Sequence, residues 1–279
     1  MSHEAQSHTP PDLRIESRNL KFQASDRAVR WWHGGDPIAT AFFNALSALF
    51  PQGERFFIDS VKRYRTLAHP KLEKQIATFI TQEALHTREH LAFNRLASER
   101  GYDLSEIDRF LTKRISFARS RPEREQLAAT IALEHFTAIL AHELLRDPRY
   151  LDGVPTEIQQ LWRWHAIEEI EHKGVAFDTF LAATKDISGL RRWFIRSYVM
   201  VITTILFFHE VGYGVSRFFR QDGINTPKTW LRFLHYLLVR PGMLRRVIAS
   251  YFTYYRPGFH PWHVDDRPLI SMYEPQLAL

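Results

Sequence analysis

Apolar residues recur every three or four positions along most of the chain, which is the period of an α-helix that buries one face. Proline, glycine and capping residues interrupt this period and divide it into separate segments. No segment has the sustained alternation that is typical of a β-strand. The pattern predicts an all-α protein with helices at about 36–50, 53–67, 70–100, 103–120, 123–146, 156–186, 188–220, 227–239 and 241–255.

Local signals mark the ends of several of these helices. Pro51 and Gly53 should break or kink the first helix, because proline lacks an N–H and clashes with the preceding turn. Gly101 is expected just beyond the end of the helix at 70–100. Three segments resemble capping boxes, in which side chains pair with the N–H groups of the first turn: Asp103 to Glu106, Ser120 to Glu123 and Thr156 to Gln159.

The spacing of the long helices predicts how they are connected. Short loops join neighbours in a simple up-and-down bundle, whereas a ferritin-like bundle has one long crossover. Here a long segment, itself helical, separates the helices at 70–100 and 123–146. We therefore expect an N-terminal arm at 1–30, a ferritin-like four-helix bundle with a helical crossover at 31–186, an added helical region at 187–256 and a C-terminal tail at 257–279.

Two Glu-x-x-His motifs lie within the predicted helices, Glu83 to His86 and Glu169 to His172. Positions i and i+3 share a helix face, so each motif directs a carboxylate and an imidazole to one point. Each motif follows a glutamate within an earlier helix, Glu54 or Glu134, and a glutamate among apolar residues is costly to bury unless it is paired or binds a metal. The repeated pattern predicts a di-metal site on four helices.

His165 lies one turn before Glu169 on the same helix face and is a seventh candidate ligand. The predicted set is Glu54, Glu83, His86, Glu134, His165, Glu169 and His172. The chain has no cysteine, so its metals would be bound by oxygen and imidazole nitrogen, which suits iron, manganese or zinc. His90, one turn beyond His86, is left open as a further ligand or as a support for one.

Other polar residues near the motifs are expected to have ordinary roles. We expect Glu168 and Glu171, which flank Glu169 on other helix faces, in solvent or in salt bridges, and Glu89 and Glu143 as surface charges. A metal-bound histidine usually donates its second N–H to a carboxylate or a carbonyl. Asp59 and Asp178 are the two candidates for that acceptor, and the sequence does not choose between them.

Charge is unevenly distributed along the chain. The formal net charge is +6, but residues 187–256 hold eleven Lys and Arg against two acidic residues, which is a charge of +9. The same stretch has 15 of the 38 aromatic residues. Apolar helices interleaved with arginine favour an anionic lipid surface or a lipid-like small-molecule substrate. No motif for reading a nucleic-acid groove is present, so we expect no nucleic-acid partner.

Two segments indicate where in the cell the protein is expected: the N-terminus and the most apolar stretch. The N-terminus is polar and lacks the apolar core of a signal peptide, which favours a cytoplasmic protein. The most apolar stretch, Tyr198 to Phe208, has eleven residues and is too short to span a bilayer. We therefore expect at most a peripheral membrane contact through 187–256, and a homodimer is left open.

Five segments resemble a bacterial family described as predicted metal-dependent hydrolase and grouped with ferritin-like proteins: ALFPQGERFF, FITQEALHTREH, ALEHFTAIL, WHAIEEIEHKGVAFD and YYRPGFHPW. The resemblance extends over about residues 30–265 and implies a metal enzyme. The pattern that includes His165 also resembles di-iron oxygenases of the aminobenzoate N-oxygenase type, which implies a site of three histidines and four glutamates.

These observations leave three hypotheses about function. The first is a di-iron enzyme that uses O₂ as a co-substrate to oxidise an apolar or amphiphilic small molecule. The second is a two-metal hydrolase of an ester or phosphate, with zinc, manganese or iron, which agrees with the family description. The third is a metal-binding or iron-storage bundle without enzymatic activity, and the long aromatic region beyond the bundle argues against storage.

Overall fold

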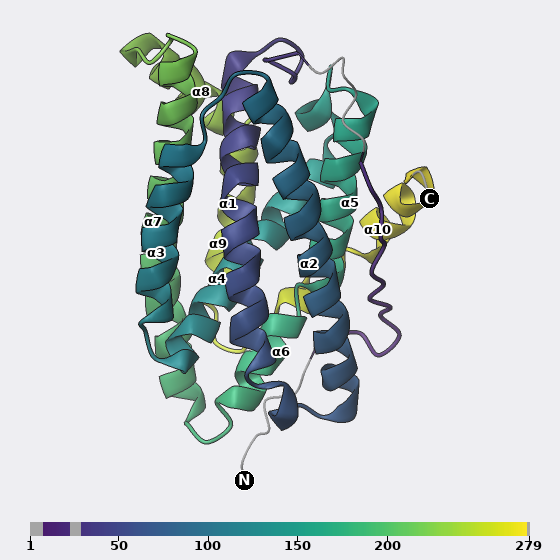
Figure 1. Ribbon diagram of the computed structural model, residues 1–279. Coiled ribbons are helices and arrows are strands. Elements are labelled where there is room, and N and C mark those ends of the chain that lie inside the picture. The colour runs from purple at the N-terminus through teal and green to yellow at the C-terminus, as the bar shows by residue number, and fades with distance from the viewer. Residues whose placement is uncertain (1–7, 23–28, 278–279) are drawn as a thin grey trace.

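The computed structural model describes residues 8–22 and 29–277, and within these ranges it contains helices and no strands. The α-helices are α1 (Pro37–Lys62), α2 (Pro70–Glu99), α3 (Ser105–Arg119), α4 (Glu123–Arg146), α5 (Thr156–His172), α6 (Val175–Ala183), α7 (Gly189–Gln221), α8 (Pro227–Leu238), α9 (Met243–Thr253) and α10 (Arg267–Tyr273). The prediction of an all-α protein built on a helical bundle is confirmed (Figure 1).

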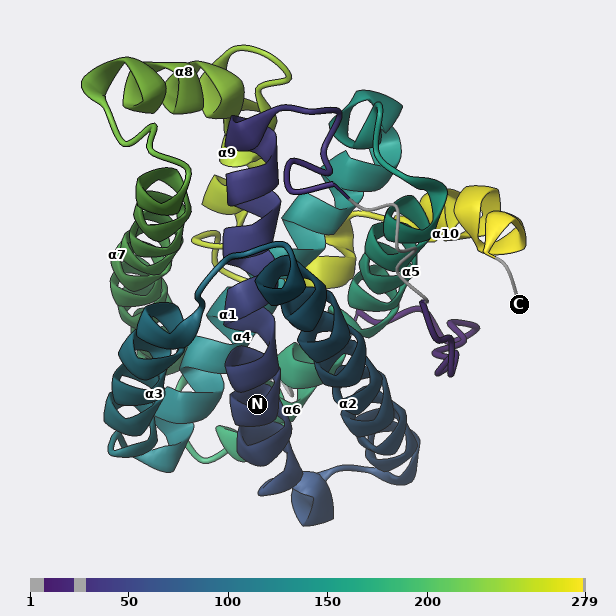
Figure 2. The same ribbon diagram turned by 45° about the horizontal axis from the view of Figure 1, so that its top comes forward.

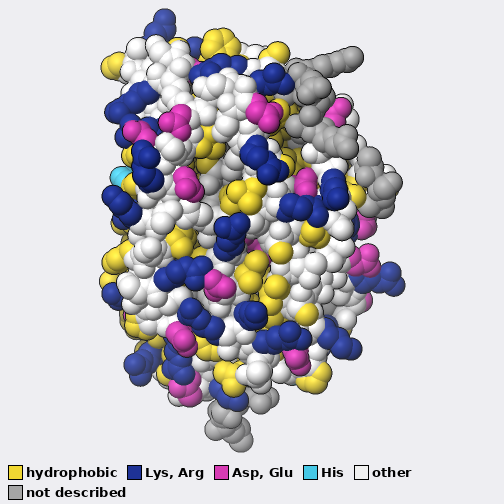
Figure 3. Space-filling model, in the orientation of Figure 1, with side chains coloured by type: hydrophobic (Ala, Val, Ile, Leu, Met, Phe, Trp, Pro, Cys, Tyr) yellow, Lys and Arg dark blue, Asp and Glu magenta, His cyan; other side chains and the backbone are white. Residues whose placement is uncertain are grey.

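Four helices form the centre of the bundle. Helix α1 packs on α2 and α4, and α5 packs on the same two helices, so the four enclose a common interior (Figures 1 and 2). Helix α3 connects α2 to α4 and packs on α1, which places the long helical connection where the sequence predicts it. On the face that α1, α2 and α3 present in Figure 3, basic and acidic side chains are interspersed.

Helix α1 is continuous through Pro51, so the predicted break is wrong. A proline inside a helix leaves the carbonyl four residues earlier without its N–H partner. Here that carbonyl belongs to Ser47, and it accepts a hydrogen bond of 3.1 Å from the Asn94 side-chain amide on α2. A neighbouring helix therefore supplies the donor that proline lacks, and the helix carries Glu54 past this point without interruption.

The helix predicted at 156–186 is divided in two. Helix α5 ends at His172, and α6 begins at Val175 after a turn at Lys173 and Gly174. The turn is tightly covered by the C-terminal segment: a Cβ at Gly174 would lie 2.7 Å from Cδ1 of Trp262. The Lys173 ammonium is hydrogen bonded to Asp266 and lies over the Trp262 ring. Packing by residues distant in sequence thus sets the end of α5.

The predicted capping boxes do not form as expected. Helices α4 and α5 begin after Pro122 and Pro155, and neither start has a side-chain cap. At α3 the Asp103 carboxylate accepts a hydrogen bond of 2.8 Å from the Ser105 N–H, although Leu104 is the residue at the cap position. At α4 and α5 proline itself occupies the cap position, and its side chain has no oxygen that could accept a hydrogen bond from the first turn.

The remaining helices lie against the bundle. Helix α7 packs on α1 and α4, α9 packs on α4, and α8 contacts α1 and α9. Helix α7 is long and apolar enough to cross a membrane, with a window of 18 residues whose mean hydropathy is 1.5. This window is longer than the eleven-residue stretch that the sequence suggested, and 33 % of it is buried inside the structure.

The N-terminal arm lies along the bundle in residues 8–22, without helix and with one turn near its start, and residues 1–7 and 23–28 of the predicted arm lie outside the described residues. Backbone N–H groups of the arm donate to side chains of the bundle: Glu16 to Glu171, Arg18 to Glu168, and Phe22 to Glu89. The arm therefore covers the outward side of α2 and α5 beside the predicted metal ligands.

Candidate metal centre

The seven residues predicted as metal ligands meet in the interior of the bundle. Helix α1 contributes Glu54, α2 contributes Glu83 and His86, α4 contributes Glu134, and α5 contributes His165, Glu169 and His172. All seven are buried, with at most 4 % of each residue exposed. The His172 Nε2 atom lies 3.3 Å from Glu83, 3.5 Å from Glu134 and 3.6 Å from Glu169, so side chains from three helices converge on one imidazole.

Many of the inward-facing polar atoms have no hydrogen-bond partner. These atoms are Oε1 of Glu54, both carboxylate oxygens of Glu83 and of Glu134, Nδ1 of His86, Oε2 of Glu169 and Nε2 of His172. Each unpaired buried polar atom costs about 1–3 kcal/mol, so eight in one place would be strongly destabilising. Metal ions would satisfy all of them, and a donor set of oxygen and imidazole nitrogen fits iron, manganese or zinc.

The ligand atoms are close enough together to share ions. Four groups of three residues offer atoms that lie within 4.8 Å of one another: Glu54, Glu83 and His86; Glu83, Glu169 and His172; His86, His165 and Glu169; and Glu54, His90 and His165. Glu134 belongs to none of these groups, but its Oε2 atom lies 3.5 Å from Nε2 of His172. The overlap of the groups indicates room for more than one ion.

The pKa values of the buried glutamates in the metal-free cluster indicate that a bound cation would stabilise it. Burial and the nearby Glu134 carboxylate hold the pKa of Glu83 well above its ordinary value, and burial raises the pKa of Glu54 to about 8. Burial also raises the pKa of Glu134, with a further contribution from Glu169. The pKa of Glu169 is instead lowered, because His172, His165 and His86 together outweigh its burial. Bound cations would favour the ionised form of all four carboxylates.

Two histidines are oriented by partners outside the cluster. The His86 Nε2–H group donates to Glu168 Oε2 at 3.1 Å, which leaves Nδ1 facing the cluster. The His172 Nδ1–H group donates to Gln82 Oε1 at 3.1 Å, which leaves Nε2 facing it. This arrangement is typical of metal-binding histidines, in which the second nitrogen is hydrogen bonded and the ring is thereby fixed.

Arg18 of the N-terminal arm balances the charge behind these histidines. Its guanidinium donates to Glu171 at 2.6 Å and lies 3.5 Å from Glu168. Glu171 also accepts a hydrogen bond of 2.9 Å from Gln82. Of the two alternatives for Glu168 and Glu171, solvent or salt bridges, the structure shows salt bridges, and both residues are buried. Glu168, not Asp59 or Asp178, is the carboxylate that accepts the second N–H of His86.

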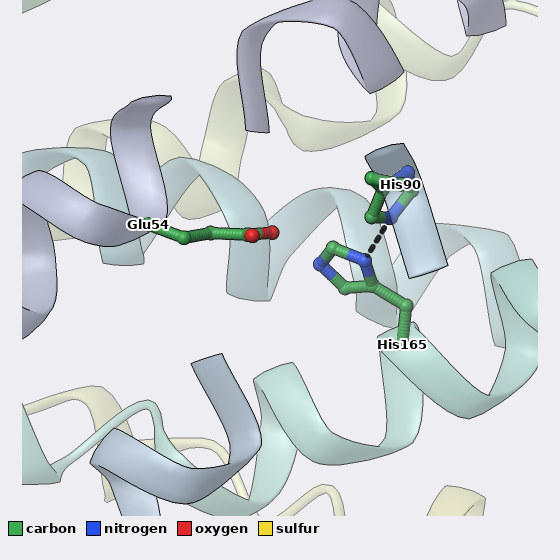
Figure 4. A group of neighbouring side chains, drawn as sticks. All are labelled: Glu54, His90 and His165. Atoms are coloured by element: carbon green, nitrogen blue, oxygen red, sulfur yellow. Dashed lines mark hydrogen bonds between the residues drawn. The ribbon is translucent and has the colours of Figure 1, made fainter. Parts of the chain in front are cut away.

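His90 lies beside His165, with its Nε2 atom 2.5 Å from His165 Nδ1 (Figure 4). The other His90 nitrogen is 2.9 Å from the Ser47 hydroxyl, and His165 Nε2 donates to Glu169 at 2.9 Å. The Glu54 carboxylate points toward this pair from α1 (Figure 4). Burial lowers the pKa of His165 to about 4 and that of His90 as well, so both rings are neutral. Both nitrogens of each ring are hydrogen bonded, so His165 would bind a metal only by giving up its bond to Glu169 or to His90.

Other polar residues that the sequence singled out lie outside the cluster. Asp59 forms an ion pair with Arg119, and Asp178 accepts hydrogen bonds from Thr9 and His260. Glu89 and Glu143 are buried, so their assignment to the surface is wrong: Glu89 accepts hydrogen bonds from the arm and from Arg88, and Glu143 from Arg146.

An apolar cavity reaches the cluster. Its volume is about 50 Å³, and apolar side chains of α1, α4, α5, α7 and α9 enclose it, including Phe50, Leu140, Phe207 and Met243. Among its lining residues are His165 and Glu169, so one side of the cluster faces an apolar space. A groove of about 320 Å³ between α3, α4 and α7 shares Phe207 with this cavity.

The comparison with protein families agrees with this centre. Residues 16–265 match the family described as predicted metal-dependent hydrolase. The chain belongs to this family. The part that matches the predicted metal-dependent hydrolases begins before Arg18 and contains every residue of the cluster, and the family description indicates a metal-dependent enzyme. No curated protein and no solved structure matches the chain.

Proposed function

We propose that the protein is a dinuclear metal enzyme whose ions are held by the seven predicted residues. The observation that carries the proposal is the set of unpaired carboxylate and imidazole atoms that converge in the bundle from six of these residues. His165 is included because its ring lies within 4.8 Å of ligand atoms of His86 and Glu169. Glu54, Glu83 and His86 would hold one ion. Glu134, His165, Glu169 and His172 would hold the other.

The hydrogen bonds of the individual carboxylate oxygens indicate how many oxygens each glutamate could offer to a metal. Glu54 keeps one oxygen hydrogen bonded to Thr87 at 2.8 Å, and Glu169 keeps one bonded to His165, so each has a single oxygen free. Both oxygens of Glu83 and of Glu134 are free. These two glutamates would therefore hold the ions with either or both of their oxygens.

We further propose that the enzyme is a di-iron oxidase or oxygenase that acts on an apolar part of a small molecule. Two bound iron ions would supply the electrons for the reaction with O₂, and an external two-electron donor would restore them. The protein would contribute an apolar cavity in which Phe50, Leu140 and Phe207 limit the access of water and hold an apolar group beside His165 and Glu169. Glu168 and Gln82 keep two ligand imidazoles in position.

Hydrolysis is the second candidate, and the family description favours it. The same carboxylates and imidazoles would then hold zinc or manganese, which would lower the pKa of a bound water. The narrow apolar cavity at His165 and Glu169 is less suited to a polar ester or phosphate than to a hydrocarbon group, which is why oxidation is placed first.

Metal analysis and reactivity with O₂ distinguish these candidates. The purified protein is assayed for metal content, and its anaerobic Fe(II) form is then mixed with O₂ while oxygen consumption and near-ultraviolet absorption are followed. The zinc and manganese forms are tested with ester and phosphate substrates. We expect two ions per chain and rapid oxygen consumption. Zinc in the purified protein, no reaction with O₂ and metal-dependent hydrolysis would refute the oxidative function.

Substitutions test the site separately from its activity. Glu83→Ala with Glu169→Ala should abolish metal binding, because both carboxylates face the converging atoms. Glu99→Ala and Glu157→Ala replace exposed glutamates on the same two helices and serve as matched controls. Retention of two ions by the Glu83 and Glu169 double variant would refute the site itself.

A further inference from the structure

Helix α7 exposes an apolar stripe. The stripe follows positions three or four residues apart, which share one helix face, and consists of Leu190, Phe194, Tyr198, Val201, Ile205 and Phe208. Their exposed fractions range from 40 % to 67 %. The opposite face of α7 is buried against α1 and α4 through residues such as Met200 and Val215. An outward helix face in water is ordinarily polar, and this one is apolar along more than five turns.

Helix α9 extends this apolar surface. It lies beside the first half of α7, because the Trp193 indole N–H donates to the Tyr255 carbonyl at 2.7 Å and the Thr204 hydroxyl is 2.9 Å from the Tyr251 hydroxyl. Its outer side exposes two further apolar side chains, Ile248 and Phe252. The six stripe residues together with these two are called the α7–α9 face.

The region that carries the α7–α9 face is rich in exposed basic side chains. The exposed charged residues of 187–256 are all basic: Arg191, Arg220, Lys228, Arg232, Arg240, Arg245 and Arg256. The two acidic residues of this region are withdrawn from the surface. The Asp222 carboxylate is fully buried on Arg30, and the Glu210 side chain is 19 % exposed beside Arg114. This composition contrasts with the mixed charges of the face seen in Figure 3.

The combination of apolar and basic side chains indicates which kind of partner binds the α7–α9 face. A second copy of the chain would bring the same positive charge to the interface and would be repelled. Nucleic acid would be attracted by the charge but would leave the exposed aliphatic side chains in water. An anionic bilayer satisfies both features, because its headgroups attract arginine and its acyl chains accept apolar side chains. We propose that the α7–α9 face docks peripherally on an anionic lipid bilayer.

The buried face of α7 makes this a peripheral contact and not a transmembrane one. Met200 and Val215 pack on the bundle, and the buried Arg196 guanidinium donates to backbone carbonyls of Tyr254 and Arg256. Separating α7 from the bundle would expose this arginine and the apolar core behind it. The helix therefore lies in the plane of the membrane with only its outer stripe inserted.

A groove opens within the docking face. The groove of about 320 Å³ is lined by Tyr198 of the stripe, by the neighbouring Ile202, and at its inner side by Phe207, which also lines the cavity at His165 and Glu169. An acyl chain that left the bilayer at Tyr198 would thus approach the metal centre, with Phe207 between the two spaces. This assignment of an acyl-bearing substrate rests on the proposed function, whereas membrane docking does not.

Vesicle flotation tests the docking. The full-length protein, with and without metal, is mixed with vesicles of phosphatidylcholine alone or of phosphatidylcholine with phosphatidylglycerol. We expect salt-sensitive flotation with the anionic vesicles only. Phe194→Gln with Ile205→Gln should weaken it by about tenfold or more. The control Leu67→Gln with Met272→Gln replaces exposed apolar residues outside the face and should leave flotation unchanged.

Substitutions of exposed basic residues test the contribution of charge to docking. Arg191→Glu with Arg256→Glu should weaken flotation, whereas Lys74→Glu, an exposed lysine on α2, should not. Absence of flotation, or equal flotation with neutral vesicles, would overturn the proposal. Retention on membranes after an alkaline carbonate wash would indicate insertion of α7 and would also overturn it. So would a dimer that the Phe194 and Ile205 substitutions dissociate. Flotation of the metal-free Glu83 and Glu169 double variant keeps this result independent of the proposed function.

Discussion

Replacing Arg18 by methionine removes the positive charge that lies between two buried glutamates. The Arg18 side chain is 8 % exposed and contacts Glu171 at 2.6 Å and Glu168 at 3.5 Å. Methionine retains an unbranched apolar side chain in the same place. Removing one partner of a buried ion pair costs about 3–5 kcal/mol, because the other charge is left without compensation. Glu274, the third partner, is 40 % exposed and adds little.

Protonation of Glu171 limits this cost and makes it depend on pH. Burial raises the pKa of Glu171 to about 7 even with Arg18 present, and the loss of Arg18 would raise it further. A carboxyl group whose pKa is higher in the folded state takes up a proton there, so its contribution to stability falls as pH rises toward that value. In the Arg18→Met variant this decline continues to higher pH than in the wild type. The difference in stability between the two proteins should therefore grow from about pH 6 to about pH 9.

Thermal and urea unfolding of the metal-free protein, followed by circular dichroism, measures this difference. We expect a loss of about 3 kcal/mol near pH 9, which corresponds to a decrease in Tm of roughly 6–12 °C for a chain of this size. Arg14→Met, an exposed arginine on the same arm, is the matched control. A loss of stability below about 1 kcal/mol near pH 9, or an equal loss near pH 6 and near pH 9, would show that Arg18 does not balance a buried charge.

Three further predictions concern the metal centre and the bundle. Gln82→Leu and Glu168→Gln each disturb the partner of a ligand imidazole and should weaken metal binding by about 10–100-fold in calorimetry with little loss of helix content; unchanged affinity would refute their orienting role. Burial raises the pKa of Glu54 to about 8 and holds those of Glu83 and Glu134 above their ordinary values, so metal binding displaces protons and affinity should rise between about pH 6 and 8 by about tenfold per pH unit for each proton displaced; a constant affinity would contradict this. Asn94→Leu removes the donor to the carbonyl that Pro51 leaves unpaired and should cost about 1–3 kcal/mol in unfolding experiments. Pro51→Ala in the same chain should recover part of that loss, and no recovery would show that the amide serves another purpose.

The helices and the seven converging residues were accessible from the sequence because both depend on local periodicity. The spacing of Glu83 to His86 and of Glu169 to His172 fixes a shared helix face whatever the rest of the chain does. His165 follows from the same rule. The bundle then brings these faces together, because the residues around them are apolar and must be buried.

The residues that hold the ligands in position could not be predicted from local periodicity. Glu168 and Glu171 lie off the ligand face of α5, where an amphipathic helix ordinarily meets solvent. They are buried because the N-terminal arm, which has no periodic pattern, covers that side and brings Arg18 to them. Asn94 on α2 similarly donates to the carbonyl of α1 that Pro51 leaves unpaired. The C-terminal segment at Trp262 sets the end of α5. Each of these features depends on a contact between residues far apart in sequence.

The position of Arg18 also affects the order in which the site can be completed. Its guanidinium joins the arm to Glu171 and to Glu274, and the latter contact closes a span of 256 residues. Contacts of such separation form late, since closing a long loop costs entropy that only the finished fold repays. The helices that carry the ligands can therefore assemble before the charge behind them is balanced. Tight metal binding would then report that the arm has reached its place, and a chain clipped after Arg18 would retain the ligands but bind metal more weakly.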